Sequence, residues 1–541
     1  MSETDKQGIQ ADGRQYVADV LVIGGGPGGT WAAIAAAARG AKVILADKGY
    51  CGASGATAPS GTVVWHVPPD PEERRLAKAS RYAMGGELAE PQWMDRVLEQ
   101  TYRNLDQLAE WGYPFPEDEQ GQQRRTSLQG PEYMRLMRKR VKQAGVRILD
   151  HSPALQLLID EHGAVAGASG VGRQKDDAWQ VRAGAVVVAT GGVAFLSKAL
   201  GCNVLTGDGH LMAAEVGAQF SGMEFSNAYG LSPAFSSVTK AAFYGWATFY
   251  DASGRELQGA GSSRGRGVIA RTLLSQPVFA CLNRADETVR RQMRTAQPNF
   301  FLPFDRLGID PFSQHFPVTL RLEGTVRGTG GLRICDSQCA TSVPGLYAAG
   351  DVATRELICG GFTGGGSHNA AWALSSGFWA GSGAAEFARD HAPSASRRFR
   401  GAGGVGLQGA GIRGYDPVAV SKAVQDEVFP YDRNWFRQGD LLEDSLARLD
   451  PLWQQLRRSA PASPRQALRA REAAAMLAVS RWMYRSALAR TETRGMHRRL
   501  DCPSLDPQQR YRLLSGGLDE VWTQREAVSP IDLSLLPEKA A

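Results

Sequence analysis

Hydrophobic positions near the start of the chain fall into two short apolar runs separated by a longer helical segment. Residues 17–23 (VADVLVI) form a β-rich run of the kind that is buried in a parallel sheet. Residues 30–39 (TWAAIAAAAR) predict a helix that ends at Gly40, and residues 42–46 (KVILA) predict a second strand. This order predicts a β-α-β unit.

Beyond this unit the pattern is first helical, then mixed, then helical again. Residues 71–150 are mostly helical, with amphipathic spacing at 92–111 and 131–144. From about 226 to 330 the composition is mixed, with many aromatic, serine and glycine residues, which predicts a separate inserted domain. The other expected elements are strands at 155–159, 164–167, 185–189 and 345–349, helices at 367–389, 440–458 and 464–491, a linker at 401–411 and an irregular tail from Pro503.

The elements together predict an α/β protein with three parts. These are a Rossmann-like dinucleotide-binding domain, an inserted α+β capping domain and a C-terminal helical domain. A chain of 541 residues is too long for a single hydrophobic core. The expected divisions are 1–225 and 331–395 for the dinucleotide-binding domain, 226–330 for the capping domain and 396–541 for the helical domain.

Composition supports a fold with many close backbone approaches. Glycine accounts for 63 of the 541 residues, or about 12%, compared with about 7% in average proteins. The net charge of +6 is mild for this length, and no block of Lys and Arg suggests a nucleic-acid partner. The charge is explained by an ordinary solvated surface, or alternatively by a docking face for an acidic electron-transfer partner.

The cysteines and the first residues of the chain indicate the cellular environment of the protein. Seven cysteines are scattered along the chain, and the pair Cys335 and Cys339 has no further cysteine or histidine nearby, so neither a metal site nor a disulfide framework is predicted. The first residues are polar, and no run of about 18 apolar residues occurs. We expect a soluble, cytoplasmic protein without a membrane span.

A glycine-rich turn between the first strand and the first helix carries the strongest chemical signal. In Gly24-x-Gly26-x-x-Gly29 the first glycine permits a tight turn, the second lets the backbone approach a pyrophosphate, and the third lets helix and strand pack closely. The helix N-terminus offers free N–H groups to the phosphates. Asp47 ends the second strand and is expected to accept hydrogen bonds from the adenosine ribose. The dinucleotide site is assigned Gly24, Gly26, Gly28, Gly29, Asp47 and Lys48.

Two later segments, 186–192 (VVVATGG) and 344–352 (PGLYAAGDV), resemble the FAD-domain motifs of two-dinucleotide flavoproteins. With them, the chain resembles the flavoprotein subunits of succinate dehydrogenase and fumarate reductase, a group that includes L-aspartate oxidase and the α subunit of adenylylsulfate reductase. The further segments that carry this resemblance are 54–61 (SGATAPSG), 206–209 (TGDG), 223–225 (MEF), 251–257 (DASGREL), 266–271 (RGVIAR) and 491–501 (TETRGMHRRLD).

The resemblance implies FAD as the cofactor. The membrane-bound relatives attach FAD through a histidine in the segment that corresponds to 54–61, where this chain has none, so we expect non-covalent FAD. The resemblance places further FAD-binding residues at Ser54, Gly55, Ser60, Gly61, Thr190, Gly191, Asp208, Asp351 and Ser367.

The expected substrate site departs from the pattern of the family. Tyr229 stands where the family has a substrate-binding histidine, and in 326–331 (VRGTGG, for the family's H-Y-T-M-G-G) Val326 replaces a second histidine. His368 takes the place of an arginine by spacing. Only Arg266, at the position of the proton-transferring arginine, is retained, and Arg327 adds an unmatched charge that could hold an anion.

Each of these residues also has a structural alternative. Tyr229 could pack under the inserted domain, His368 could cap a helix, and Arg266 could belong to a solvated basic loop. In the C-terminal motif, Arg494, His497 and Arg498 touch the flavin pocket or, as we favour, brace the helical domain.

The predicted function is an FAD-dependent oxidoreductase acting on a small substrate other than succinate or fumarate. Because the chain has no cluster motif, its electrons must pass to oxygen, a quinone, a nicotinamide or a separate protein, and an iron–sulfur, ferredoxin-like partner is favoured. The alternatives are a non-catalytic electron-transfer or scaffold flavoprotein, and a true succinate dehydrogenase or fumarate reductase flavoprotein. Homo- and hetero-oligomers both remain open.

Overall fold

The computed structural model describes residues 13–117, 120–175, 177–239, 242–262, 265–363, 366–391, 397–407, 416–459 and 463–528. Of the linker expected at 401–411, residues 408–411 lie outside the described residues, as do the two ends of the chain.

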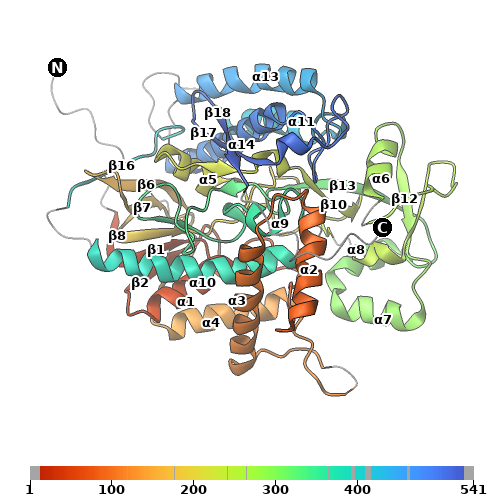
Figure 1. The fold of residues 1–541 in the computed structure, drawn as a ribbon, viewed down its shortest axis with the longest axis horizontal. Coiled ribbons are helices and arrows are strands. Elements are labelled where there is room, and N and C mark those ends of the chain that lie inside the picture. Colours follow the sequence, from red (N-terminus) through yellow and green to blue (C-terminus); the bar gives the residue numbers. More distant parts are fainter. Residues whose placement is uncertain are drawn as a thin grey trace.

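An eight-stranded sheet forms the centre of the dinucleotide-binding domain (Figure 1). The predicted β-α-β unit is present: β1 (Arg14–Ile23) and β2 (Val43–Ala46) are parallel neighbours joined by α1 (Pro27–Ala37). The strand order is β16-β6-β7-β8-β1-β2-β5, and β15 also pairs with β8. The remaining strands are β5 (Arg147–Leu149), β6 (Ala154–Asp160), β7 (Val165–Val171), β8 (Ala178–Val188), β15 (Leu346–Ala348) and β16 (Phe399–Gly401).

The register of the parallel strands creates one functional edge. Ile23 at the end of β1 lies opposite both Ala46 of β2 and Val188 of β8. The carboxyl ends of these three strands therefore meet, which is where open α/β sheets bind ligands. Helix α10 (Ser367–Asp390) packs closely on α1 because it carries glycine: a Cβ at Gly381 would lie 2.1 Å from Ala32 O.

The capping domain contains an antiparallel sheet in the order β10-β13-β12-β11. The aromatic residues at 243–250 contribute to its core, since Phe243, Tyr244 and Phe249 are buried. Figure 1 shows this domain at the right, beside the dinucleotide-binding domain. Its elements are β10 (Ala228–Pro233), β11 (Thr248–Tyr250), α6 (Arg266–Thr272), β12 (Val278–Cys281), α7 (Glu287–Ala296), α8 (Pro298–Leu307) and β13 (Phe316–Gly324).

The C-terminal helices lie at the top of Figure 1 and are followed by a β-hairpin. The irregular tail predicted from Pro503 is wrong at this point, because β17 (Tyr511–Gly516) and β18 (Trp522–Ala527) pair with each other and β17 pairs with β9 (Phe220–Ser221). β18 is largely exposed, so it has no apolar alternation that sequence could reveal. The helices are α11 (Pro417–Val428), α12 (Tyr431–Asn434), α13 (Gly439–Arg457) and α14 (Pro464–Ala489).

The remaining elements complete the fold. They are β3 (Gly61–Val63), β4 (Ser127–Gln129), β14 (Gly331–Leu332), α2 (Pro71–Met84), α3 (Pro91–Glu110), α4 (Gly130–Gln143), α5 (Asp208–Glu215), α9 (Glu356–Cys359) and four 3₁₀ turns, η1 (Met223–Phe225), η2 (Phe243–Trp246), η3 (Gly350–Val352) and η4 (Pro507–Gln509).

A buried network of charges joins the C-terminal domain to the rest of the molecule. Arg490 Nε donates to Glu224 at 2.8 Å, and Arg490 Nη1 donates to Glu492 at 2.9 Å. Arg494 donates to the same Glu492 oxygen at 2.6 Å and also to Gly86 O. All four charged side chains are buried. The network therefore ties the 491–501 motif to η1 and to the loop between α2 and α3.

A second buried carboxyl beside this network predicts a pH effect on stability. Burial and the nearby Glu224 carboxylate raise the pKa of Glu356 from 4.5 to about 8. Since the unfolded chain releases this proton near the lower value, the fold loses stability as the pH rises from about 4.5 to about 8. We expect Glu356→Gln to be more stable than the parent protein at pH 8, with the advantage shrinking toward pH 5, in urea titrations.

The matched control is Glu526→Gln, because Glu526 pairs with Arg333 at the surface. This control should not change the dependence of stability on pH. A Glu356→Gln protein that is destabilised equally at both pH values would contradict the prediction.

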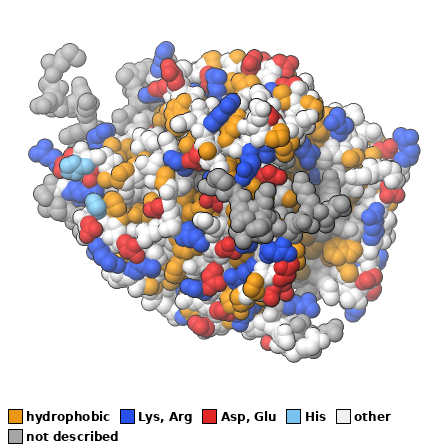
Figure 2. Space-filling view, viewed as in Figure 1, with side chains coloured by type: hydrophobic (Ala, Val, Ile, Leu, Met, Phe, Trp, Pro, Cys, Tyr) orange, Lys and Arg blue, Asp and Glu red, His pale blue; other side chains and the backbone are white. Residues whose placement is uncertain are grey.

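Two further properties of the molecule are the distribution of charge on its surface and the apolarity of its helices. Figure 2 shows Lys and Arg side chains interspersed with Asp and Glu over the visible face, which fits an ordinary solvated surface. None of the helices in the described segments combines the length and the apolarity that crossing a membrane requires.

Candidate active site

The glycine-rich turn has the geometry that its sequence predicts. Gly24 has a φ of +111°, and a Cβ there would lie 2.2 Å from Ala189 O. A Cβ at Gly29 would lie 1.8 Å from Gly24 O, so the third glycine allows helix and strand to pack. A Cβ at Gly26 would meet no protein atom within 4 Å, because this position faces open space.

A long cavity begins at this turn and follows the carboxyl edge of the sheet. Of the predicted FAD-binding residues, all except Gly29 and Ser367 line it. Gly29 supports the turn from behind, and the Ser367 hydroxyl contacts His368 Nδ1 at 3.2 Å. The lining predicted residues are Gly24, Gly26, Gly28, Asp47, Lys48, Ser54, Gly55, Ser60, Gly61, Thr190, Gly191, Asp208 and Asp351.

The cavity fits FAD by its donor set as well as by its glycines. The Thr190 hydroxyl and Asn369 Oδ1 are buried in its lining without a hydrogen-bond partner among the described residues. Buried polar atoms of this kind are normally satisfied, and a polar ligand would satisfy them. The residues present therefore suit a dinucleotide.

Asp47 organises the loop around the turn. Its Oδ2 accepts a hydrogen bond from Gly25 N at 2.6 Å, and its Oδ1 accepts from Gly49 N and Ser54 Oγ, both at 2.7 Å. The carboxylate thus holds the residues that follow β1 and β2 together. Its hydrogen bond to a ribose stays a prediction.

Three ion pairs at the cavity were not anticipated from the sequence. Lys48 Nζ lies 2.7 Å from both Asp208 and Glu472, and Glu472 comes from α14 of the C-terminal domain. Asp351 pairs at 2.7 Å with the fully buried Arg355. Burial raises the pKa of Asp351, and the Arg355 charge opposes that rise.

A second cavity of about 330 Å³ adjoins the first. Its size falls at the lower end of the range for small-ligand sites. Residues of the dinucleotide-binding, capping and C-terminal domains surround it. Both cavities are lined by Gly61, Thr62, Arg327 and Gly366, so these residues form the wall between them.

Arginines dominate the charged lining of this second cavity. Arg266, Arg327 and Arg498 line it, and Glu323 is the one carboxylate among the described lining residues. Arg266 Nη1 donates to Tyr229 O at 2.9 Å. Burial lowers the pKa of Arg266, Glu323 partly offsets this effect, and Arg327 and Arg498 add to it.

Tyr229 contributes its backbone to this site, and its hydroxyl is engaged elsewhere. The hydroxyl donates to Val428 O at 3.0 Å, and the ring lies beside Tyr431 and Trp435. The Tyr229 ring therefore packs against the C-terminal domain, while the residue remains among those that line the second cavity. Val326 lines the first cavity and not the second.

The prediction that His368 reaches the substrate is not supported by its position. His368 is 3% exposed, its ring lies 4.5 Å from that of Trp65, and it lines neither cavity. Burial lowers its pKa well below 6.5, so the ring is neutral. The reason is that α10 begins at Ser367 and turns the next side chain inward.

The C-terminal motif divides between the two roles that were considered for it. Arg494 and His497 are buried and brace the domain, since His497 Nδ1 contacts Arg437 at 2.8 Å. Arg498 instead lines the second cavity, with its guanidinium 5.5 Å from the Trp435 ring centre. The sequence leaves both roles open for Arg498, and it holds no signal for Glu323 as a cavity residue.

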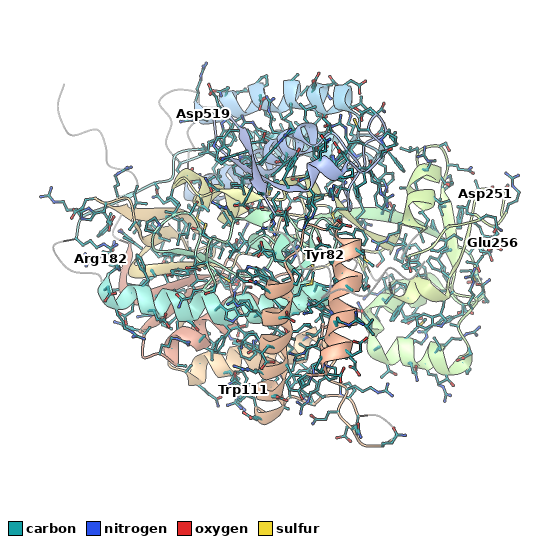
Figure 3. The ribbon with its side chains drawn as sticks, in the orientation of Figure 1. Tyr82, Trp111, Arg182, Asp251, Glu256 and Asp519 are labelled. Atoms are coloured by element: carbon teal, nitrogen blue, oxygen red, sulfur yellow. The ribbon has the colours of Figure 1, made fainter. Side chains whose placement is uncertain are left out.

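The 251–257 motif forms a turn at the periphery. Asp251 Oδ1 accepts hydrogen bonds from Ser253 N at 2.9 Å and from Arg255 N at 3.0 Å. Figure 3 shows Asp251 and Glu256 at the outer edge of the capping domain. This motif therefore shapes the fold and does not line either cavity.

A glycine-lined dinucleotide cavity that adjoins a small, charged cavity is the arrangement expected of a flavin-dependent oxidoreductase. Comparisons agree with this class: residues 19–229 match the family model described as FAD binding domain, and residues 427–530 match the one described as fumarate reductase flavoprotein C-term. The chain belongs to the succinate dehydrogenase and fumarate reductase flavoprotein superfamily, and it is an FAD-dependent oxidoreductase of that type.

Relatives cover most of the chain at low identity. L-aspartate oxidase of Mycobacterium tuberculosis is 26% identical over 93% of this chain and 96% of its own length. One subunit of the fumarate reductase (CoM/CoB) of Methanothermobacter marburgensis is 24% identical over 62% of this chain and 67% of its own length.

Solved structures share the fold. The FrdA chain of E. coli quinol fumarate reductase superposes with a TM-score of 0.81 at 22% identity, covering 96% of this chain and 98% of that one. Adenylylsulfate reductase of Archaeoglobus fulgidus gives 0.71 at 18% identity, covering 96% and 97%.

Proposed function

We propose that this oxidoreductase acts on a small anionic substrate, other than succinate or fumarate, that binds in the arginine-lined cavity next to FAD. The observation that carries the proposal is the charge of that cavity. Three arginines face one carboxylate among the described lining residues, and the cavity shares a wall with the dinucleotide cavity.

The arginines support an anion because two of them form no ion pair among the described residues. Among the described residues, no carboxylate lies within ion-pair distance of Arg266 or Arg498. Burial lowers the pKa of both guanidinium groups, which reflects the cost of holding a charge away from water. An anionic substrate would compensate that cost through charge-assisted hydrogen bonds.

The side chains at the two changed histidine positions argue against succinate and fumarate. The Tyr229 hydroxyl is committed to Val428 O, and Val326 has no hydrogen-bonding side chain. The dicarboxylate contacts that the family resemblance would supply at these two positions are therefore absent from them.

The residues of this chain would divide the reaction between them. FAD, when bound, supplies the capacity to accept or donate an electron pair. Arg327 and Arg498 would hold the anion, and Arg266 would move a proton between its guanidinium and the substrate. The capping domain would exclude water, which strengthens each of these electrostatic contacts.

A separate protein is the proposed electron acceptor or donor, with a ferredoxin-like iron–sulfur protein favoured. The relative in M. marburgensis is itself named as one subunit of an enzyme, which supports such an assembly. An affinity pull-down of this chain from its own cells, probed for iron and acid-labile sulfide, tests this part of the proposal. Recovery of the flavoprotein alone would count against it.

Rapid mixing of the FAD-loaded protein with candidate substrates tests the substrate class. The oxidised protein is mixed with sulfite, thiols, L-aspartate and succinate, and the reduced protein with adenylylsulfate and fumarate, while the flavin absorbance is followed. We expect a response to a small anion other than succinate and fumarate. A response confined to succinate and fumarate would contradict the proposal, and no response to any compound would favour the non-catalytic alternative.

A further inference from the structure

Arg327 occupies the wall that separates the dinucleotide cavity from the substrate cavity. It is one of the residues that line both. A Cβ built on Gly366 would lie 3.7 Å from Arg327 Nη1 and 3.9 Å from the Thr62 hydroxyl. Because Gly366 and Thr62 also line both cavities, the guanidinium itself lies at the shared wall.

The backbone around Arg327 is held firmly in place. Arg327 O accepts a hydrogen bond from the Thr363 hydroxyl at 3.0 Å. The preceding carbonyl, Val326 O, accepts from Asn369 Nδ2 at 2.8 Å and from Arg355 Nη2 at 3.4 Å. These contacts fix the base of the side chain relative to the start of α10.

The charge of Arg327 is only partly neutralised. Its nearest counter-charge is Glu323, whose Oε2 lies 3.6 Å from Arg327 Nε, beyond good hydrogen-bond distance. The other oxygen of Glu323 accepts from the Thr239 hydroxyl at 2.7 Å. Glu323 is 5% exposed, whereas the Arg327 side chain is 36% exposed, so the carboxylate is shielded from water while the guanidinium stays partly solvated.

The charge acts in both cavities. On the dinucleotide side, burial raises the pKa of Asp351, and the charges of Arg355 and Arg327 oppose that rise. On the substrate side, burial lowers the pKa of Arg266, and Arg327 contributes in the same direction. In the family motif H-Y-T-M-G-G, a tyrosine follows the histidine that Val326 replaces. This chain has Arg327 at the tyrosine position, so the positive charge departs from the family pattern.

We propose that Arg327, with Glu323 as its partial counter-charge, raises the reduction potential of the bound FAD. Reduction adds electron density to the flavin, and a fixed positive charge at the cavity wall stabilises the reduced form relative to the oxidised form. Glu323 sets the size of the effect because it opposes the Arg327 charge. The inference depends on FAD binding and not on the proposed substrate.

Midpoint potentials measured without substrate, by reductive titration against a reference dye, test the proposal. We expect Arg327→Gln to lower the midpoint potential by about 30 mV or more. For a two-electron couple, this corresponds to at least a tenfold change in the reduction equilibrium. Arg327→Lys keeps the charge and should stay close to the parent protein. Glu323→Gln removes the opposing charge and should raise the potential.

Arg498→Gln is the matched control, because it removes the same charge from a residue that lines only the substrate cavity. Its shift should be smaller than that of Arg327→Gln. An unchanged potential in Arg327→Gln, an equal shift in Arg498→Gln, or an unchanged potential in Glu323→Gln would overturn the proposal. If Arg327→Gln holds no FAD, the potentials of Arg327→Lys and Glu323→Gln decide the outcome.

Discussion

Replacing Arg266 with lysine should lower turnover by about 100-fold or more while leaving FAD bound, since a positioned proton donor contributes about 10² to 10⁴ in rate. Arg266 begins α6, lines the second cavity, which is the proposed substrate cavity, and donates a hydrogen bond to Tyr229 O. Lysine keeps the positive charge but lacks the planar guanidinium, whose several N–H groups can contact Tyr229 O and the cavity at the same time. Flavin content measured alongside kcat separates a lost proton transfer from a lost cofactor.

Arg271→Lys provides the control for this substitution. Arg271 lies on the same helix, with its guanidinium 4.6 Å from the Phe436 ring centre, and does not line the cavity. It should retain most activity. Equal turnover in Arg266→Lys and the parent protein would remove Arg266 from the proposed mechanism.

Replacing Glu492 with alanine should lower the free energy of unfolding by about 3–5 kcal/mol, the range for breaking a buried ion pair. Glu492 accepts hydrogen bonds from both Arg490 and Arg494, and all three side chains are buried. Its removal leaves two cations in the interior with less compensation. Guanidinium titrations monitored by tryptophan fluorescence measure the change.

The surface pair of Glu526 and Arg333 gives the matched comparison. These side chains are 27% and 31% exposed, so Glu526→Ala should cost less than about 1 kcal/mol. Similar losses in the two variants would show that the buried network does not hold the C-terminal domain as the structure indicates.

Local chemistry decided which parts of the fold could be predicted. The turn at Gly24 to Gly29 could be read from the sequence because its steric requirements arise within a few residues and the two flanking strands. The hairpin of β17 and β18 could not, because β18 is exposed and pairs through its backbone. Such pairing leaves no hydrophobic period in the sequence.

The substrate cavity shows the same division. Arg266 and Arg498 both lie in segments that carry the family resemblance, whereas Glu323 lies near the end of β13 and reaches the cavity only because the folded chain brings distant segments together. His368 was placed at the substrate by spacing along the chain, and the helix that starts at Ser367 turns it toward Trp65 instead. Spacing fixes the position of a backbone and leaves the direction of the side chain open.

Gly26→Ala offers a clean perturbation of the cofactor site. A methyl group at this position meets no protein atom within 4 Å, so the fold should survive while the methyl group takes space in the dinucleotide cavity. We expect a folded protein with much weaker FAD binding, measured by flavin fluorescence on reconstitution. Gly245→Ala is exposed and equally free of contacts, and it should bind FAD normally.

The flavin content of the purified protein tests the account most directly. The absorbance spectrum should show a bound flavin at about one per chain, and acid precipitation should release it intact into the supernatant because no histidine stands in residues 54–61 to attach it. A colourless protein that takes up no FAD on reconstitution would contradict the assignment of the glycine-lined cavity.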